Sequence, residues 1–292
     1  MGQAGCGVFV GLTSLDMVHF LPSAPGRNEK VFDQGSFVGA GGPASNAAIT
    51  FAALGGRAHL FSAVGEHPVS SMITTEFRKF GVSHQDTDPG RSTPPSIASI
   101  VVSTENGDRS VVTSQAPPSN QPESLEQVQL HEDLEILLSD GHDLHLAMHA
   151  VRSAKERGAT AVLDGGSWKP GTEHLLPYVD DAIVSERFRP PGTHHSDEVL
   201  DFLQKAGVSR AAITRGEREI LFFNAAGATG QIEVPKIQAV DTLAAGDIFH
   251  GAYCHAIHRG LDFEPALEYA ASIAGRSCGH LGPRAWIDNC TL

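Results

Sequence analysis

Short apolar segments typical of buried strands alternate with helix-like segments through most of this chain, and this alternation is the strongest constraint on its fold. In the second half, strands are expected at 134–138, 159–164, 182–185, 211–214, 219–224 and 229–234, and helices at 145–157, 197–206, 246–258 and 265–277. Strands joined by helices form a mostly parallel sheet that helices cover on both faces. We therefore expect one large α/β domain.

The first half continues this pattern. We expect strands at 7–11 and 59–65 and helices at 44–54 and 70–80. Pro43 lies in the first turn of the Ala-rich helix at 44–54, and Gly55 follows its last apolar residue. Proline is favoured at the start of a helix and glycine just after its end, so both residues support this assignment.

Two β-rich segments interrupt the alternation. Residues 12–42 contain several Pro and Gly and an alternating piece at 31–34, which predicts short strands and turns. Residues 94–116 contain two apolar runs separated by Asn106-Gly107, a strong hairpin signal. We expect the two segments to form one small β layer beside the large domain.

Charge and apolar patterning exclude several classes of protein. The 292 residues include 21 Lys and Arg and 34 Asp and Glu, so the net charge is −13. Such a surface repels phosphate backbones, and nucleic acid is not expected as a partner. There is no apolar run long enough to span a membrane and no secretory leader pattern, which indicates a cytoplasmic protein without a membrane partner. The cysteines lack metal-site spacing and are expected to be reduced thiols: Cys6, Cys254, Cys278 and Cys290.

The clearest chemical signal lies at the start of the helix expected at 246–258. Ala244, Ala245 and Gly246 are small enough to let a ligand approach the backbone. The first amides of a helix have no partner within it, and the helix dipole adds positive charge, so this turn suits a phosphate. Asp247 could take the proton from a hydroxyl while the amides hold the phosphoryl group under attack. The alternative is an ordinary capping aspartate on a core helix.

Two motifs resemble the signatures of the ribokinase-like (PfkB) family of carbohydrate kinases. Asp241-Thr242-x-Ala244-Ala245-Gly246-Asp247 resembles the C-terminal signature, and Gly41-Gly42-x-x-x-Asn46-x-Ala48 resembles the N-terminal one. They occur in the order of the family, and the resemblance covers essentially the whole chain, residues 1–292. It implies a ribokinase-like three-layer sandwich in which the segments 12–42 and 94–116 form a β-sheet lid over the sugar.

The resemblance also implies roles for individual residues, with ATP and Mg²⁺ as cofactors. Asp247 would be the catalytic base, and Arg109 would reach the transferred phosphate, since its planar fork pairs with phosphate oxygens. The implied sugar-binding residues are Asp16, Gly41, Gly42 and Asn46. The implied nucleotide-binding residues are Thr214, Gly216, Thr242, Ser272, Gly275 and Cys278, the last three in a run that is closest to ketohexokinase.

This sequence also departs from the family pattern. The metal-side motif N-x-x-E is missing near 185–188, as in ketohexokinase-like members, and Glu186 is the nearest candidate for a water-mediated Mg²⁺ contact. Pro43 stands where ketohexokinase has a sugar-contacting Asn. Lys30 stands where the sulfofructose kinase branch has a sulfonate-binding Lys, but His142 lies near the place of that branch's Arg and borders the expected sugar site. The identity of the sugar therefore stays open.

Three further patterns indicate other functions. Gly39-x-Gly41-x-x-Ala44 fits a dinucleotide fingerprint, but a strand and a β-rich piece precede it, whereas that fingerprint normally follows the first strand of its sheet. The spacing of residues 142, 145 and 149, all histidine, could hold zinc, although a polar helix face is the favoured interpretation. His250, one turn after Asp247, faces either the nucleotide or the core.

The sequence therefore predicts an ATP-dependent kinase that phosphorylates a hydroxymethyl group of a small, ketohexose- or ribose-like sugar. A homodimer formed through the lid is expected. One alternative is a nucleoside kinase, in which Phe20 or Phe37 would line an apolar pocket for the base. The other is a non-catalytic sugar- or nucleotide-binding protein on the same fold, with which the missing N-x-x-E motif would be compatible.

Overall fold

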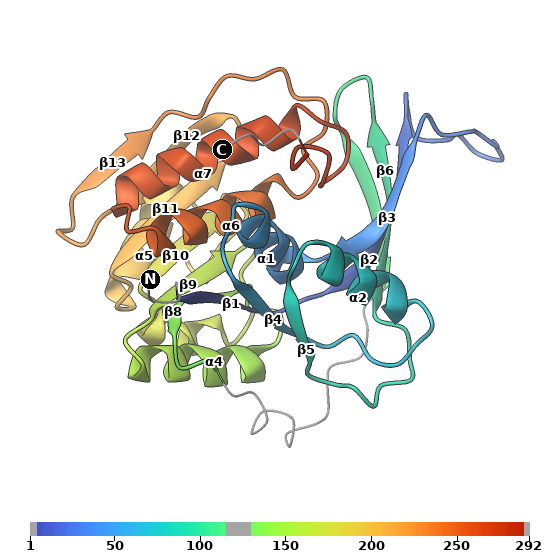
Figure 1. The fold of residues 1–292 in the computed structure, drawn as a ribbon. Helices are drawn as coiled ribbons and strands as arrows, with labels where there is room; N and C mark the ends of the chain where they lie inside the picture. Colours follow the sequence, from blue (N-terminus) through green and yellow to red (C-terminus); the bar gives the residue numbers. More distant parts are fainter. Residues whose placement is uncertain (1–4, 115–129, 289–292) are drawn as a thin grey trace.

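A computed structural model describes residues 5–114 and 130–288 (Figure 1). Within these residues the main sheet has nine strands in the order β13-β12-β11-β10-β9-β8-β1-β4-β5. Its strands are β1 (Cys6–Val10), β4 (Ala58–Ser62), β5 (Ser83–Asp86), β8 (Leu134–Ser139), β9 (Thr160–Gly165), β10 (Asp181–Ser185), β11 (Arg210–Arg215), β12 (Arg218–Phe223) and β13 (Thr229–Ile232). The pairings from β5 to β11 are parallel, and β12 and β13 add an antiparallel edge. The expected mostly parallel α/β sheet is confirmed.

Helices cover both faces of this sheet. One face carries α1 (Pro43–Ala53), α6 (Ala245–His258) and α7 (Phe263–Cys278), and the other carries α4 (Leu144–Glu156) and α5 (Ser196–Lys205) (Figure 1). Alternate residues of one strand face opposite layers: Phe9 packs in the core cluster with α1 and α6, whereas Val8 and Val10 pack with α4. The short strand β5 and the 3-10 helices η1 (Thr172–His174) and η2 (Leu176–Tyr178) were not predicted.

A second, four-stranded sheet stands beside the main one, with the order β3-β2-β6-β7 (Figure 1). Its strands are β2 (Ser14–Leu21), β3 (Ser36–Gly41), β6 (Ser96–Ser103) and β7 (Arg109–Ser114). The β2–β6 pairing is parallel and joins the two segments that the sequence separates, and the other pairings are antiparallel. The expected small β layer therefore forms, although residues 115 and 116 lie outside the described part. We call this sheet the lid.

One detail of the lid prediction is wrong. The alternating piece at 31–34 is a loop, and the Phe32 side chain is 83% exposed. The Gln34 amide donates to the Phe20 carbonyl, at 2.8 Å, where the chain first meets the edge of β2, and residues 31–33 lie before this point. An apolar alternation forms a strand only where a neighbouring strand offers hydrogen bonds, and here β2 has already ended.

The helix α2 (Ser70–Lys79) joins the main domain to the lid, because it contacts β5 on one side and β2 and β3 on the other. Helices α1 and α6 cross closely, since a Cβ on Gly251 would lie 2.4 Å from the Ala47 carbonyl oxygen. This crossing fixes the N-terminus of α6 next to that of α1. The two signature motifs of the sequence thereby meet.

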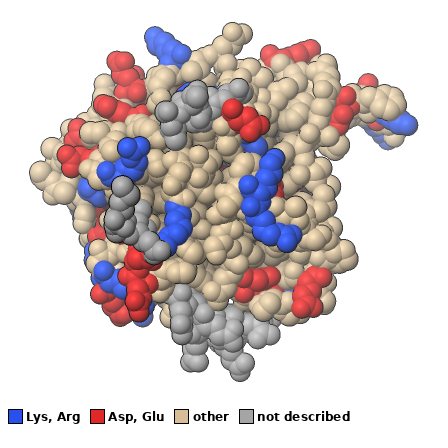
Figure 2. All heavy atoms as spheres, viewed as in Figure 1, with Lys and Arg blue, Asp and Glu red and all other residues tan. Residues whose placement is uncertain are grey.

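The surface and the cysteines agree with the composition. Acidic and basic side chains occur in small groups over the face seen in Figure 2. No helix of the described residues is long and apolar enough to cross a membrane. The three described cysteines, Cys6, Cys254 and Cys278, are free and buried, and Cys290 lies outside the described residues.

Candidate active site

The loop before α6 leads into the first turn of that helix, where the Ala245 amide donates to the Thr242 carbonyl at 3.3 Å. Ala244 caps the helix in the left-handed conformation, with φ 59°, and no side chain caps it. Gly246 is exposed, and a Cβ placed on it would have no neighbour within 4 Å. Asp241 fixes the loop, since its carboxylate accepts from the Leu243 and Gly282 amides, both at 2.8 Å. Residues 244–247, which the sequence predicts as an amide-rich turn, thus form the N-terminal turn of α6.

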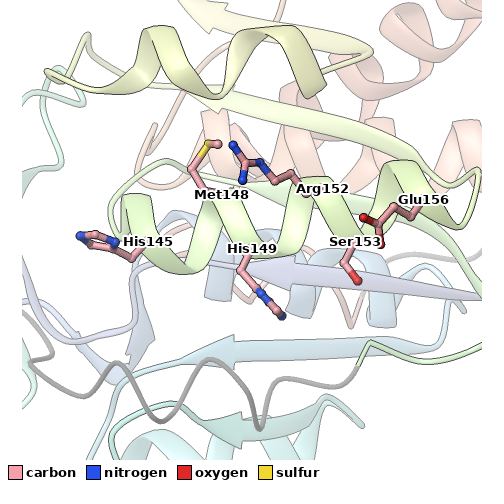
Figure 3. Close-up of a pocket in the computed structure, with 6 residues that line it drawn as sticks. All are labelled: His145, Met148, His149, Arg152, Ser153 and Glu156. Atoms are coloured by element: carbon pink, nitrogen blue, oxygen red, sulfur yellow. The ribbon is translucent and has the colours of Figure 1, made fainter.

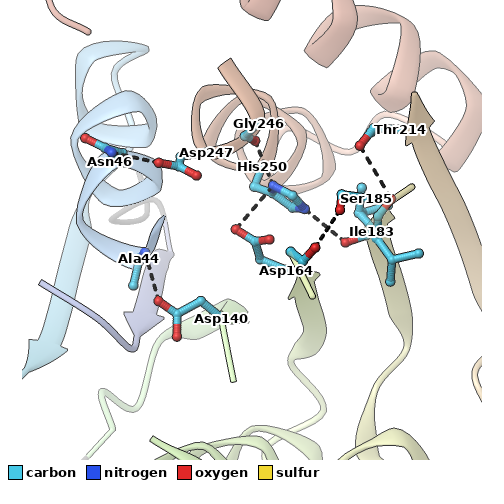
Figure 4. A network of polar contacts seen from close by, with 12 residues as sticks. Ala44, Asn46, Asp140, Asp164, Ile183, Ser185, Thr214, Gly246, Asp247 and His250 are labelled. Atoms are coloured by element: carbon cyan, nitrogen blue, oxygen red, sulfur yellow. Dashed lines mark hydrogen bonds and ion pairs between the residues drawn. The ribbon is translucent and has the colours of Figure 1, made fainter. Parts of the chain in front are cut away.

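Asp247 lies in this first turn and points toward α1 (Figure 4). Its Oδ2 accepts a 2.7 Å hydrogen bond from Asn46 Nδ2. Burial raises the pKa of Asp247 to about 7, with a further rise from the nearby Asp164 carboxylate, while Asn46 and His250 act in the opposite direction. A carboxyl group with such a pKa can gain or lose a proton near neutral pH, which suits a general base.

The amide of Asn46 is itself held by Arg284, a residue that the sequence reasoning missed. Arg284 Nη2 donates to Asn46 Oδ1 at 2.8 Å and to the Ala40 carbonyl at 2.7 Å, and its Nε donates to Glu76 Oε1 at 2.9 Å. Arginine only donates hydrogen bonds, so the Asn46 oxygen must face it and the Asn46 amino group must face Asp247. The arrangement of Asn46 is therefore determined by the buried Arg284–Glu76 ion pair.

Asp16 and the two glycines of the first motif form a close backbone cradle. Asp16 is 8% exposed, its Oδ1 accepts from Ser14 Oγ at 2.7 Å, and burial raises its pKa. A Cβ on Gly41 would lie 2.0 Å from the Asp16 carboxyl carbon. Gly42 has φ +93°, and a Cβ there would lie 2.4 Å from the Leu12 carbonyl oxygen. A larger residue at position 41 would displace the Asp16 carboxylate, and one at position 42 would clash with backbone.

Two further carboxylates, also missed, lie at the same edge of the sheet. Asp140 follows β8 and accepts hydrogen bonds from the Leu12 amide at 2.8 Å and the Ala44 amide at 3.2 Å. Asp164 ends β9 and is 5% exposed. A signal for both was present, because an acidic residue after a buried apolar run lies at the carboxyl end of a parallel strand, where ligands of α/β sheets bind. Arg284, in a loop after the last helix, carries no such signal.

His142 lies beside Asp140. The His142 amide donates to Asp140 Oδ1 at 3.0 Å, and its ring Nδ1 lies 3.5 Å from the same oxygen. His142 precedes α4, which is capped by Asp143, so it does not share a helix face with His145 and His149. Among the residues that the structure describes, there is no group of three or more His, Cys, Asp and Glu that could hold a metal ion.

Arg109 lies on the lid and reaches the loop before α6. Its Nη1 donates to the Thr242 carbonyl at 3.1 Å and to Thr242 Oγ1 at 3.2 Å. The β6–β7 hairpin thus brings Arg109 next to the amide-rich turn, although 133 residues separate it from Thr242. Both side chains are exposed and accessible to a ligand.

The expected metal-side residue Glu186 lies at the carboxyl end of β10. Its amide donates to the Thr214 carbonyl at 3.0 Å, so Glu186 and Thr214 are neighbours at the ends of adjacent strands. Arg218 Nη2 donates to Glu186 Oε2 at 2.5 Å and lowers the pKa of this exposed carboxylate. Gly216 follows in an exposed turn with φ +67°.

The expected adenine-side residues lie along α7. Ser272 is exposed, and Gly275 is buried against the preceding segment, where a Cβ would meet Ile237 at 3.8 Å. The Cys278 carbonyl accepts from the Val240 amide at 2.7 Å, and burial raises the pKa of the Cys278 thiol. Cys278 therefore holds the loop through its backbone rather than through a reactive sulfur.

A hollow of about 390 Å³ lies elsewhere, on the outer side of α4 (Figure 3). It is lined by His145, Met148, His149, Arg152, Ser153 and Glu156. All six residues belong to one helix, on the opposite face of the sheet from α6. The hollow is thus separate from the residues that converge on Asp247. The dinucleotide fingerprint is also excluded, since Gly39 and Gly41 lie in lid strand β3 and not after the first strand of the main sheet.

Comparisons with known proteins agree with this geometry. The model of the pfkB family carbohydrate kinases matches residues 8–290. A ribokinase from Haemophilus influenzae is 23% identical over 290 residues, which cover 95% of this chain and 94% of the relative. A deoxyribokinase from Salmonella typhi is 21% identical over 282 residues, or 92% of this chain and 90% of the relative.

Solved structures show the same fold. Ribokinase from Thermotoga maritima superposes with a TM-score of 0.78 at 20% identity, covering 98% of each chain. Ribokinase from Arabidopsis thaliana, solved with ribose and ATP, has a TM-score of 0.75 at 22% identity and covers 96% of this chain and 94% of its own. The expected ribokinase-like three-layer fold is confirmed.

Proposed function

The chain belongs to the PfkB family of carbohydrate kinases, and we propose that it transfers the γ-phosphoryl group of ATP to a hydroxymethyl group of a small, ketohexose- or ribose-like sugar. The observation that carries this proposal is the position of Asp247 on the amide-rich first turn of α6. Its pKa of about 7 and its hydrogen bond from Asn46 suit a base that takes the proton of an attacking hydroxyl.

The residues around Asp247 divide the remaining tasks. The amides of Ala244, Ala245 and Gly246 would hold the transferred phosphoryl group, and Arg109 would pair with its oxygens. Thr242, Thr214, Gly216, Ser272, Gly275 and Cys278 would line the nucleotide side. Catalysis of this type depends mainly on positioning and electrostatic stabilisation.

The sugar would lie between the lid and the main sheet. Asp16 and Asn46, with the backbone of Gly41 and Gly42, would bind its hydroxyls, and His142 would border it. Carboxylate and amide oxygens accept hydrogen bonds from hydroxyl groups. The lid would exclude water, so that ATP is not hydrolysed without the sugar.

One carboxylate near the proposed nucleotide side suits Mg²⁺. Glu186 is an exposed carboxylate kept ionised by Arg218, and Mg²⁺ in kinases is bound by one or two carboxylates, waters and substrate phosphates. Glu186 would contact the ion through water, and the ion would neutralise phosphate charge.

A nucleoside acceptor is less well supported. Phe20 is 4% exposed and packs in the lid cluster with Val18 and Ile100, and Phe37 packs against that cluster and against the Arg284 guanidinium, 5.8 Å from its ring centroid. The Phe20 ring is thus already covered by protein, and the Phe37 ring is partly covered. A nucleoside base would have to displace these contacts.

The test is ADP release measured over a panel of ketoses, aldoses, sugar acids, sulfosugars and nucleosides. At least one neutral sugar should stimulate ADP release. Asp247→Ala should abolish it while ATP binding, measured by calorimetry, is retained, and Asp201→Asn, an exposed carboxylate on α5, serves as the matched control. Retained turnover in Asp247→Ala overturns the mechanism. ATP or sugar binding without ADP release by the parent would instead favour a non-catalytic binding protein.

We also propose a homodimer through the lid. Among the described residues β7 is an edge strand of the lid sheet, all of its residues are exposed, and the Val112 side chain is 75% exposed. An edge strand that exposes two neighbouring valines, Val111 and Val112, is a surface on which a second chain can pair. Light scattering should give a dimer mass for the parent and a monomer mass for Val112→Lys. A monomeric parent at high concentration contradicts the proposal.

A further inference from the structure

His250 is a buried histidine directly behind the catalytic turn (Figure 4). It lies one turn after Gly246 in α6 and is 4% exposed. Its Nδ1 lies 2.7 Å from the Gly246 carbonyl oxygen, and its Nε2 lies 3.1 Å from the Ile183 carbonyl oxygen in β10. Both ring nitrogens therefore face backbone oxygens.

A ring that donates to both carbonyls must be charged. A carbonyl oxygen only accepts hydrogen bonds, so each ring nitrogen must carry a proton to form its contact. A neutral imidazole has one N–H group, whereas the imidazolium has two. The hydrogen bonds of His250 are thus those of the imidazolium.

A buried cation needs a counter-ion, and one is present. Asp164 Oδ2 lies 3.4 Å from His250 Nδ1. This buried oxygen has no hydrogen-bond partner among the described residues. Burial raises the pKa of Asp164, and the positive charge of His250 opposes that rise. The unpartnered oxygen is the group that a charged His250 would neutralise.

We propose that His250 is a positioning residue: an imidazolium at neutral pH, paired with Asp164, which holds the Gly246 carbonyl of the phosphate-binding turn and presents a fixed positive charge to Asp247. The inference rests on the proposed role of Asp247 as the base. It assigns to the Asp164–His250 pair the task of keeping that base ionisable in a site rich in carboxylates.

The charges that face Asp247 come from several elements. Asp164 from β9 and Asp16 from β2 raise its pKa, whereas Asn46 from α1 and His250 from its own helix lower it. Arg284 from the C-terminal segment also interacts with Asp247. The remaining groups that act on Asp164 are Asp140, Lys169 and His142. Without the positive charge of His250, the repulsion between the Asp247 and Asp164 carboxylates would be less compensated.

The charge of His250 can be measured without turnover. Two-bond ¹H–¹⁵N NMR spectra of the full chain distinguish an imidazolium from either neutral tautomer. His250 should show the imidazolium pattern at pH 7.5. His255 provides a reference on the same helix, since burial lowers its pKa to about 4 and it should be neutral. A neutral pattern for His250 at pH 7.5 overturns the proposal, whatever the activity of the protein.

The effect on Asp247 and the pairing with Asp164 are tested by two variants. His250→Gln removes the positive charge and should move the Asp247 side-chain ¹³C titration, and the acid limb of kcat/KM, up by about one pH unit. Asp164→Asn removes the counter-ion, so His250 should lose the imidazolium pattern at pH 7.5. Urea unfolding of both variants shows whether either has lost packing.

Controls separate this inference from the proposed function. His149→Gln changes an exposed histidine on α4 and should leave the titration unchanged. If no acceptor supports ADP release, the proposed function fails, while the ¹³C titration still reports on His250. No upward shift in His250→Gln, or an imidazolium pattern of His250 that persists in Asp164→Asn, contradicts the inference.

Discussion

The side-chain amide of Asn46 donates a 2.7 Å hydrogen bond to the carboxylate of Asp247, across 201 residues of sequence. Each residue belongs to one of the two signature motifs, so the motifs meet in a single contact. The contact depends on the crossing of α1 and α6, which brings the N-termini of both helices to the carboxyl edge of the sheet. It stabilises the ionised form of Asp247.

Removal of this hydrogen bond should shift the pH dependence of catalysis. The raised pKa of Asp247, about 7, places the acid limb of kcat/KM near neutrality, with activity rising as the pH rises and the base ionises. Asn46→Asp replaces the donor by a like charge and should move this limb to higher pH, with a loss of about tenfold or more at pH 7. Asn106→Asp, in the exposed lid turn, is the control. An unchanged limb in Asn46→Asp would show that the contact does not act on Asp247.

The glycine at position 42 should be indispensable for steric reasons. Gly42 and Gly55 both have positive φ, +93° and +98°, but a Cβ on Gly42 would lie 2.4 Å from a backbone oxygen, and one on Gly55 meets nothing within 4 Å. Gly55→Ala should cost about 1 kcal/mol for the conformation alone. Gly42→Ala adds a clash with backbone and should cost at least about 2–3 kcal/mol. Urea unfolding measures both, and equal losses would contradict the clash.

Much of the fold follows from local sequence. Strands β6 and β7 form the hairpin that was predicted within residues 94–116, because the Asn106-Gly107 turn and the apolar runs beside it are local signals. Strand β5 was missed because its four residues, Ser83–Asp86, are polar and only half of them are partly buried. Its pairing with β4 forms through tertiary contacts, which no local pattern encodes.

Part of the site was also predictable from local sequence signals. Asp247 and the turn before it carry a local signal, since small residues precede a helix that begins with a carboxylate. Arg284 carries none, because its role depends on contacts with Glu76, Ala40 and Asn46, which lie 208, 244 and 238 residues away. Residues that position a catalytic side chain by long-range contacts are found only from the fold.

Arg109 should act on catalysis with little effect on stability. It is exposed, and its bonds to Thr242 are accessible to solvent, so their loss changes the free energy of unfolding by less than about 1 kcal/mol. Arg109→Ala should lower kcat by about 10²-fold through the loss of a donor to the phosphoryl group. Arg109→Lys should restore little, because lysine lacks the planar fork. Arg152→Ala, on the outer face of α4, is the control, and full activity of Arg109→Ala contradicts the role.

The Arg284–Glu76 pair should be essential for the fold as well as for the site. Arg284 is 9% exposed, and removal of one partner leaves the other charge buried and unpaired. Arg284→Met should cost about 3–5 kcal/mol in unfolding free energy. Glu76→Gln should cost less, because the neutral amide can still accept from Arg284. Loss of less than about 1 kcal/mol in Arg284→Met would mean that the pair does not hold Asn46 and Ala40 in place.

Asp247 should also reduce the stability of the protein in a pH-dependent way. Its pKa is about 7 in the folded state and near the ordinary value of 3.8 in the unfolded chain, so the folded protein binds a proton that the unfolded chain releases between these values. This bound proton stabilises the folded state fully below about pH 4, and the stabilisation is lost as the pH rises through about 7.

The Asp247→Asn variant cannot ionise at this position. It should be more stable than the parent at pH 8, by about 1–3 kcal/mol, and the difference should vanish near pH 4. Urea unfolding at both pH values measures this, with Asp201→Asn as the exposed control. If the variant is less stable than the parent at pH 8, burial does not destabilise the ionised carboxylate. The raised pKa of Asp247, on which its role as a base depends, would then be wrong.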